Sequence, residues 1–262
     1  MKTFAVLMYH SVSPVGGRLR RLGTPPSALL DQLTLLRNEG YELLGLTEAF
    51  EAAAKDPTRA VVALTFDDGY RDFTEVAVPI LTAVGARATV YVPTMHVGRS
   101  AAWLGAGAES LPALMSWDEL RRCVNAGCVE VGSHSHSHAQ LDTLPPAALR
   151  RELADSKEML ERNLQITVDS FCYPHGYHTL AVRDAVRAAG YGNACEVGRR
   201  LRSTQHQWSI SRIAVDSTRT PAQVLNDVRS GGPIVAPAAK RALRPIWRQV
   251  RLRCPNIEAR LS

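Results

Sequence analysis

The sequence lacks several features that would assign it to a specialised class of protein. Its five cysteines are an odd number and form no CxxC pair, which argues against a disulfide framework or a zinc ribbon and favours a reducing, cytoplasmic environment. No apolar run approaches the roughly 18 residues of a membrane span. The opening residues, MKTFAVLMYHSV, contain no small-residue cleavage site. We interpret them as a buried strand rather than a signal peptide.

Most of the chain also lacks an excess of charge. The net charge is +6, but residues 232–262 contain seven basic residues and one acidic residue, so this tail carries the whole excess. Basic and aromatic residues are not interleaved on the remaining body, which argues against nucleic-acid binding. A basic tail on a neutral body instead suits an anionic surface.

The basic tail contains a pattern typical of an amphipathic helix. Four apolar residues recur at helical spacing and three arginines fall largely on the other side: Leu243, Ile246, Trp247 and Val250, and Arg244, Arg248 and Arg251. Such a helix can lie peripherally on an anionic membrane, here the inner face. The alternative is a terminal helix that packs on the body with a solvated basic face.

Short apolar segments alternate with longer amphipathic ones, and no repeat or low-complexity linker interrupts them. We expect strands at 4–10, 60–66, 88–92, 128–133, 168–174, 191–195 and 209–215. We expect helices over 27–40, 116–127, 145–164 and 220–232. This alternation predicts βαβ units and a mainly parallel sheet, open or closed into a barrel. A chain of 262 residues suits one undivided α/β barrel.

The first polar cluster follows an apolar strand, where the chemistry of parallel α/β folds collects. In VVALTFDDGY, Asp67, Asp68 and Gly69 follow the apolar strand. Neighbouring residues in a strand point to opposite faces, so both carboxylates reach one site only if the backbone turns, which the glycine permits. They could then divide cation ligation and proton transfer. A plain Asp-Gly turn is the alternative.

The second cluster, EVGSHSHSHAQL, places histidines at every second position. His134 and His138 share a face in a helical turn, whereas all three histidines, including His136, share one in an extended segment. The spacing favours neither geometry. Two histidines and a carboxylate leave an open position for water, as in catalytic zinc sites. A polar, solvated loop is the alternative.

Two weaker signals complete the set of polar positions. In SFCYPHGYH, the turn at Pro174, His175 and Gly176 could present backbone N–H groups to an oxyanion, although a plain proline turn has the same letters. His10 stands at the exit of the first strand. A lone histidine there is more often structural than catalytic.

Taken together and in this order, LTFDDGY, GSHSHSHAQL and CYPHG resemble the first three motifs of the polysaccharide deacetylase family, the NodB-homology domain or carbohydrate esterase family 4. LMYHSV resembles the branch that includes poly-N-acetylglucosamine deacetylases. The resemblance covers about residues 4–215. It implies an irregular (β/α)7 barrel of α/β class that holds one divalent cation, most often Zn2+. We therefore divide the chain into a NodB-like domain at 1–231 and a basic, helical tail at 232–262.

The resemblance also implies roles for individual residues. Asp67 matches the general base of the family. Asp68, His134 and His138 match the metal ligands, and His136 falls on a variable position.

Three further roles follow from the resemblance, with one departure. The backbone N–H of His175 falls where the family forms its oxyanion hole. In this branch the late histidine motif is permuted to the front, so His10 matches the general acid. The arginine that usually pairs with the base is replaced by Cys172, and Arg212 in SISRIAV is a candidate substitute.

The implied reaction removes N-acetyl, or O-acetyl, groups from an amino-sugar glycan or a lipid-linked oligosaccharide. The metal would polarise the acetyl carbonyl and activate a bound water. Asp67 would accept the water's proton, and His10 would protonate the departing amine.

Two other readings of the same residues stay open. One is a metal-dependent amidase of the same fold that acts on a small molecule such as a cyclic ureide. The other is a degenerate barrel that binds glycan without cleaving it. We expect the segment 94–115, which contains GRSAAWLGAGAES, to form a lid over the site.

Overall fold

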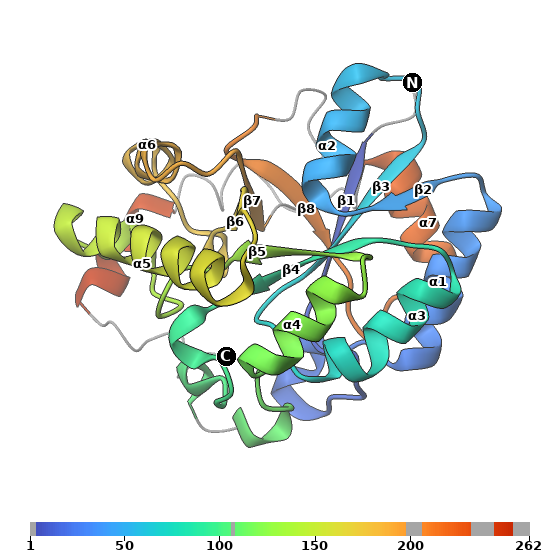
Figure 1. The fold of residues 1–262 in the computed structure, drawn as a ribbon, viewed down its shortest axis with the longest axis horizontal. Helices are drawn as coiled ribbons and strands as arrows, with labels where there is room; N and C mark the ends of the chain where they lie inside the picture. The colour runs from blue at the N-terminus through green and yellow to red at the C-terminus, as the bar shows by residue number, and fades with distance from the viewer. Residues whose placement is uncertain (1–3, 106–107, 198–205, 232–243, 254–262) are drawn as a thin grey trace.

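The computed structural model describes residues 4–105, 108–197, 206–231 and 244–253. Among these residues, seven parallel strands close into a barrel surrounded by helices (Figure 1). The strands of the ring are β1 (Ala5–Tyr9), β3 (Val61–Phe66), β4 (Ala88–Val92), β5 (Val129–Ser133), β6 (Ser170–Cys172), β7 (Asn193–Val197) and β8 (Ile210–Ala214). The ring closes because β1 pairs with both β3 and β8. This architecture confirms the predicted (β/α)7 barrel.

The barrel is irregular at β3. A short additional strand, β2 (Glu42–Leu44), pairs with the first half of β3, and β4 pairs with Thr65 and Phe66 in its second half. The same edge of β3 therefore pairs first with β2 and then with β4. The sequence prediction did not include β2, because three residues are too few to show a period.

The described helices pack mainly around the ring. They are α1 (Pro26–Asn38), α2 (Leu46–Lys55), α3 (Val78–Ala83), α4 (Trp117–Asn125), α5 (Pro146–Leu164), α6 (Leu180–Ala188), α7 (Pro221–Ser230) and α9 (Arg244–Arg253). Four of the first seven, α1, α4, α5 and α7, were predicted. The Ser116 side chain accepts from the N–H of Glu119, which completes a capping box at the start of α4.

Helix α2 closes the amino end of the barrel. The N–H of Leu46 donates to Thr89 Oγ1 at 2.7 Å, and the N–H of Thr47 donates to Glu130 Oε2 at 3.2 Å. Ala49 and Ala52 of the same helix pack against the apolar residues of the barrel interior. The carboxyl ends of the strands, which carry the polar clusters, are therefore the end available for chemistry.

Gly132 leaves space for a tyrosine ring directly below those polar clusters. A Cβ on Gly132 of β5 would lie 2.5 Å from Cε1 of Tyr91, so the tyrosine ring occupies the space that a side chain would need. Tyr91 is fully buried, and its hydroxyl lies 2.7 Å from Ser170 Oγ. The guanidinium carbon of Arg212 lies 5.7 Å from the centre of this ring. Tyr91 thus separates the packed interior from the polar layer above it.

The tail helix α9 packs on the barrel differently from the prediction. Arg251 is 2% exposed and forms a two-pronged ion pair with Asp142, at 2.7 and 2.8 Å. Arg248 Nε donates to the Asp142 carbonyl at 2.7 Å, and Trp247 Nε1 donates to Tyr177 Oη at 3.0 Å. The predicted separation of Trp247 from these two arginines is wrong, because all three face the barrel and Arg251 is the buried partner of a carboxylate. The flanking residues 232–243 and 254–262, including Leu243, lie outside the described residues.

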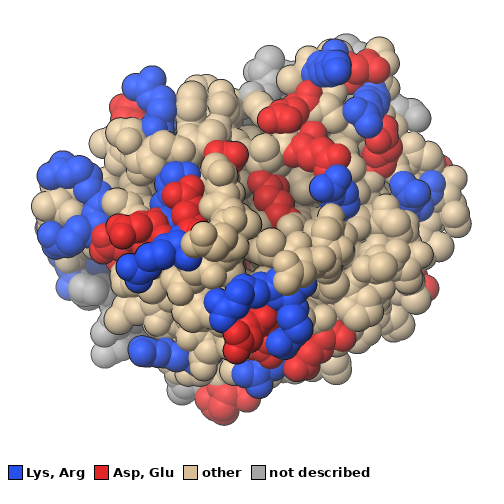
Figure 2. All heavy atoms as spheres, viewed as in Figure 1, with Lys and Arg blue, Asp and Glu red and all other residues tan. Residues whose placement is uncertain are grey.

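The surface drawn in Figure 2 carries interspersed acidic and basic side chains rather than a field of one sign. No helix within the described ranges is both long and apolar enough to cross a bilayer. The proposed boundary between a domain at 1–231 and a tail at 232–262 stays a prediction.

Candidate active site

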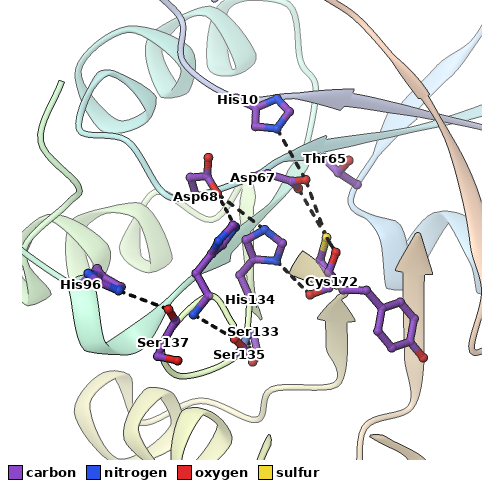
Figure 3. A network of polar contacts seen from close by, with 12 residues as sticks. His10, Thr65, Asp67, Asp68, His96, Ser133, His134, Ser135, Ser137 and Cys172 are labelled. Atoms are coloured by element: carbon purple, nitrogen blue, oxygen red, sulfur yellow. Dashed lines mark hydrogen bonds and ion pairs between the residues drawn. The ribbon is translucent and has the colours of Figure 1, made fainter. Parts of the chain in front are cut away.

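Two carboxylates lie together where β3 ends. Asp67 continues the inward-facing alternation of the strand, and its N–H donates to the Tyr9 carbonyl at 2.9 Å. Asp68 and Gly69 both adopt left-handed backbone conformations, with φ of 72° and 70°. The predicted turn therefore begins at Asp68 itself and continues through the glycine. Both aspartates are less than 5% exposed, and in Figure 3 Asp68 lies toward His134 while Asp67 lies toward Cys172 and His10.

Two of the three motif histidines meet Asp68. Its Oδ1 lies 3.6 Å from His134 Nε2 and 3.4 Å from His138 Nε2, and all three side chains are buried (Figure 3). Ligands about 2.1 Å from a tetrahedral zinc ion lie about 3.4 Å from one another. The observed spacing and the nitrogen and oxygen donors therefore fit a single divalent cation.

The protonation states of these groups suit ligation. Burial lowers the pKa of His134 to about 4 and also lowers the pKa of His138, so both imidazoles are neutral at pH 7. Burial acts to raise the pKa of Asp68, but its hydrogen bond with His138 and the neighbouring histidines outweigh this and lower it. His134 Nδ1 donates to the Cys172 carbonyl at 2.9 Å, which directs the Nε2 lone pair toward Asp68.

The histidine loop is neither a helical turn nor an extended strand. Ser135 and His138 have φ of 64° and 60°, and the N–H of His138 donates to Ser135 Oγ at 3.1 Å. Glu152 of α5 accepts from the N–H groups of His136 and Ser137, at 3.0 and 2.8 Å. These contacts bend the loop so that its outer histidines converge.

His136 points away from the aspartates. Its Nδ1 lies 2.9 Å from Thr94 Oγ1, so the structure places this middle histidine outside the cluster. Glu152, which holds the loop, was not identified from the sequence. Its place on the inner face of a long helix is not distinguishable there from an ordinary core-facing position.

Asp67 is held by Arg212 of β8, which lies across β1 from β3 in the barrel. Arg212 Nη1 and Nη2 donate to Asp67 Oδ1 and Oδ2 at 2.6 and 2.7 Å. Arg212 is fully buried, and burial acts to raise the pKa of Asp67, but the arginine's charge and hydrogen bonds lower it below the ordinary value. Asp67 is therefore a carboxylate in a fixed orientation.

The remaining donors of Arg212 are also used. Nη1 reaches Thr65 Oγ1 at 3.0 Å, Nε reaches the Glu196 carbonyl at 3.3 Å, and Nη2 lies 3.0 Å from Cys172 Sγ. All five N–H groups of the guanidinium thus have acceptors. Cys172, at the position of the usual motif arginine, lies within 3.7 Å of both Asp67 oxygens. The structure brings both residues named in the sequence analysis to the same carboxylate.

His10 approaches the same carboxylate from β1. Its Nε2 lies 4.0 Å from Asp67 Oδ2, and its side chain is 16% exposed (Figure 3). The next residue, Ser11, donates a short hydrogen bond to Asp72, which follows the Asp-Asp-Gly turn. This bond connects the segment after β1 to the segment after β3. It therefore helps to fix the position of His10 relative to Asp67.

The turn at Pro174–Gly176 lies beside the cluster. His175 and Gly176 have φ of 58° and 72°, and a Cβ on Gly176 would lie 2.7 Å from Cβ of Val197. Only glycine fits that position. The ring of His175 lies 4.7 Å from the ring of His138 between centroids, so the turn borders the set of candidate metal ligands.

An aromatic residue missed by the sequence analysis covers His138, one of the candidate metal ligands. Trp103 stacks on His138, with 4.2 Å between ring centroids and 19° between planes. It belongs to the segment 94–115 that was expected to form a lid, of which 106–107 lie outside the described residues. Trp103 is the only aromatic residue in that segment, a signal that could have identified it.

Comparison with known proteins gives matches over most of the chain. Residues 54–194 match the family model "Polysaccharide deacetylase". The Bacillus subtilis protein named "Putative polysaccharide deacetylase YxkH" is 27% identical over 214 residues, which cover 80% of this chain and 70% of that protein. The poly-beta-1,6-N-acetyl-D-glucosamine N-deacetylase of Escherichia coli K12 is 23% identical over 251 residues. That match covers 81% of this chain but 36% of the E. coli protein.

Two solved structures share the fold along nearly their whole length. The Streptococcus pyogenes deacetylase PplD in complex with acetate superposes with a TM-score of 0.73 and 24% identity, covering 88% of this chain and 98% of that chain. IcaB from Ammonifex degensii superposes with a TM-score of 0.72 and 22% identity, covering 87% and 98%.

Proposed function

Because this chain belongs to the polysaccharide deacetylase family, we propose that it is a metal-dependent hydrolase that removes N-acetyl groups from an amino-sugar glycan. The family supplies the class of enzyme, a hydrolase of carbon–nitrogen bonds other than peptide bonds. The observation that carries the metal-dependent chemistry is the meeting of Asp68, His134 and His138 beside a carboxylate that Arg212 holds in place.

The proposed cation site consists of Asp68, His134 and His138. Two neutral imidazoles and one carboxylate are a donor set typical of catalytic zinc, so Zn2+ is the cation we propose. When bound there, the cation supplies a Lewis acid that polarises the acetyl carbonyl and lowers the pKa of a water molecule. The buried position of all three ligands excludes bulk water around them.

Asp67 acts as the general base in this proposal. Arg212 occupies one side of its carboxylate and keeps it ionised, and the remaining lone pairs accept the proton of the attacking water. The water oxygen bonds to the acetyl carbon, and the backbone N–H of His175 donates to the carbonyl oxygen as negative charge develops on it.

His10 acts as the general acid. The carbon–nitrogen bond breaks only when the amine leaves as a neutral group, so a proton must reach the nitrogen. The imidazolium of His10, next to Asp67, donates it, and the products are acetate and a free amino sugar.

The E. coli relative is named for a polymer of N-acetylglucosamine, which supports an N-acetylated glycan as the substrate here. A lipid-linked form of that glycan, a peripheral membrane contact through the basic tail and a cytoplasmic location remain proposals from the composition. Liposome flotation of the full-length and 1–231 proteins tests the membrane contact, and equal behaviour would rule it out.

Acetate release is the direct test of the proposed function. We expect the zinc-loaded protein to release acetate from N-acetylglucosamine oligomers and to release it much more slowly from O-acetylated glycans. Cyclic ureides contain no acetyl group, so they are assayed separately by ring opening, which we expect to be absent. Asp67→Asn should retain zinc by elemental analysis and lose about 99% or more of the rate, given the 10²–10⁴-fold worth of general-base catalysis. Asp31→Asn, an exposed control on α1, should match the wild type. A metal-loaded protein that releases no acetate from any glycan would refute the proposal.

A further inference from the structure

Helix α9 and the loop after β6 line a half-open cavity of about 300 Å³ next to the turn at Pro174–Gly176. Tyr177 of the loop contributes to its lining, together with Trp247, Arg248 and Gln249 of the helix. Gly176, which also lines it, belongs to the turn that presents the His175 amide. The cavity therefore adjoins the turn that borders the proposed metal site.

A row of rings connects this cavity to the site. The His175 ring stands 4.7 Å from the His138 ring and 6.0 Å from the Tyr177 ring, which is stacked on it at 25°. Tyr177 in turn accepts the hydrogen bond from Trp247. The row leads from a proposed metal ligand to the tail helix, a path that a linear polymer could follow.

The cavity walls combine aromatic and polar side chains. The guanidinium of Arg251 lies 3.8 Å from the centre of the Tyr177 ring, and Asp142 holds that guanidinium from the other side. Tyr177 is thereby held in one orientation. Arg248 and Gln249 add hydrogen-bonding groups at the rim. Hexose units present apolar C–H faces and hydroxyl edges, so they match walls of this kind better than a purely apolar or purely charged ligand does.

We propose that this cavity is a subsite for a second hexosamine unit of the glycan, adjacent to the unit that is deacetylated. The inference rests on the proposed function, and it assigns to the tail helix a part in holding polymeric substrate. It predicts that oligomers bind more tightly than shorter substrates that cannot reach the cavity.

Binding of a product oligomer tests the subsite without catalysis. The fully deacetylated, β-1,6-linked glucosamine tetramer is titrated into the zinc-loaded, full-length protein. Trp247→Ala should weaken its binding about five- to tenfold, which at 1.4 kcal/mol per tenfold is about 1–1.4 kcal/mol and lies within the worth of one aromatic contact. Gln249→Ala, which leaves the ion pair of Arg251 intact, should weaken binding about twofold. Arg253→Ala, on an exposed position of α9, is the matched control and should bind as the wild type does.

The outcomes separate the two proposals. Equal binding by wild type, Trp247→Ala and Gln249→Ala, or no binding by folded wild type, overturns the subsite. Should Trp247→Ala fail to fold by circular dichroism, Gln249→Ala alone decides the matter. Selective weakening by the cavity variants, in a protein that releases no acetate from any glycan, would support the subsite and refute the deacetylase chemistry.

Discussion

The guanidinium of Arg212, in the middle of β8, donates to both carboxylate oxygens of Asp67, directly after β3, at 2.6 and 2.7 Å. The two residues are 145 positions apart in the chain and meet because β1 pairs with both of their strands. The pair is buried, and Thr65, Cys172 and a backbone carbonyl occupy the other donors of the arginine. An arginine in this position fixes the orientation and the charge of the proposed base.

Removing one partner of this buried ion pair should lower the free energy of unfolding. Arg212→Met leaves the Asp67 carboxylate buried without its counter-charge, and we expect a loss of about 3–5 kcal/mol in the free energy of unfolding, measured in urea. The double variant Arg212→Met with Asp67→Asn should regain most of that loss, although it should stay inactive. Arg229→Met, which breaks an exposed ion pair with Glu39, is the control and should change stability by less than about 1 kcal/mol. Equal losses in the two single arginine variants would contradict the prediction.

The position of the arginine should be exchangeable between strands. Cys172→Arg places a second guanidinium next to Nη2 of Arg212, and we expect at least about a hundredfold loss of acetate release because two cations would share one carboxylate. Adding Arg212→Cys should restore part of the activity, since the arginine then reaches Asp67 from β6. Cys172→Ser keeps a small polar side chain and serves as the control. A double variant no better than either single one would show that the strand, and not only the charge, matters.

Loss of His10 should depend on the leaving group. His10→Ala should reduce release of acetate from an N-acetylated sugar by about 10²–10⁴-fold, because the amine cannot leave without a proton. The same variant should hydrolyse 4-nitrophenyl acetate at close to the wild-type rate, since nitrophenolate needs no proton to leave. Parallel initial-rate measurements on the two substrates check this. Equal losses on both would remove the acid role.

Cation binding should distinguish the motif histidines. His138→Ala should lower the zinc content of the purified protein and weaken zinc binding at least about tenfold, because it removes one of three ligands. His136→Ala should retain zinc, since its ring contacts Thr94 and not Asp68. Competition with a chromophoric chelator gives both affinities. Comparable zinc affinity in the two variants would refute the ligand assignment.

The metal-free protein should lose stability in mild acid. Burial lowers the pKa of His134 from an ordinary 6.5 to about 4, so the unfolded chain binds this proton first as pH falls. The contribution of neutral His134 to the free energy of unfolding is therefore fully present above about pH 6.5 and declines as pH falls toward 4. It amounts to about 3 kcal/mol. Urea unfolding in EDTA at pH 7 and pH 5 should show the decline. His134→Gln should reduce the decline without abolishing it, because burial also lowers the pKa of His138 and of His175. His206→Gln, on an exposed position, should leave the decline unchanged.

Much of the fold was predictable from local signals. The apolar runs located all seven ring strands, and the expected helix starts at 116 and 220 coincide with the N-cap residues Ser116 and Thr220 of α4 and α7. Helices α2, α3 and α6 escaped the prediction, as did β2. The chemistry of the arginines in α9 was also misjudged, because a helical pattern cannot show that Arg251 has a buried carboxylate partner on another segment.

The sequence by itself determined the fold class, the family resemblance and the set of polar residues at strand ends. It did so through the order of its motifs, strands and helix caps. Periodicity and capping act over a few residues, so they are legible without a structure. The tertiary structure alone decided which of those residues meet. The left-handed turns at Asp68 and His138, the grip of Glu152 on the histidine loop and the reach of Arg212 to Asp67 all depend on contacts between distant segments. Such contacts form only when the barrel closes, and for that reason no local pattern encodes them.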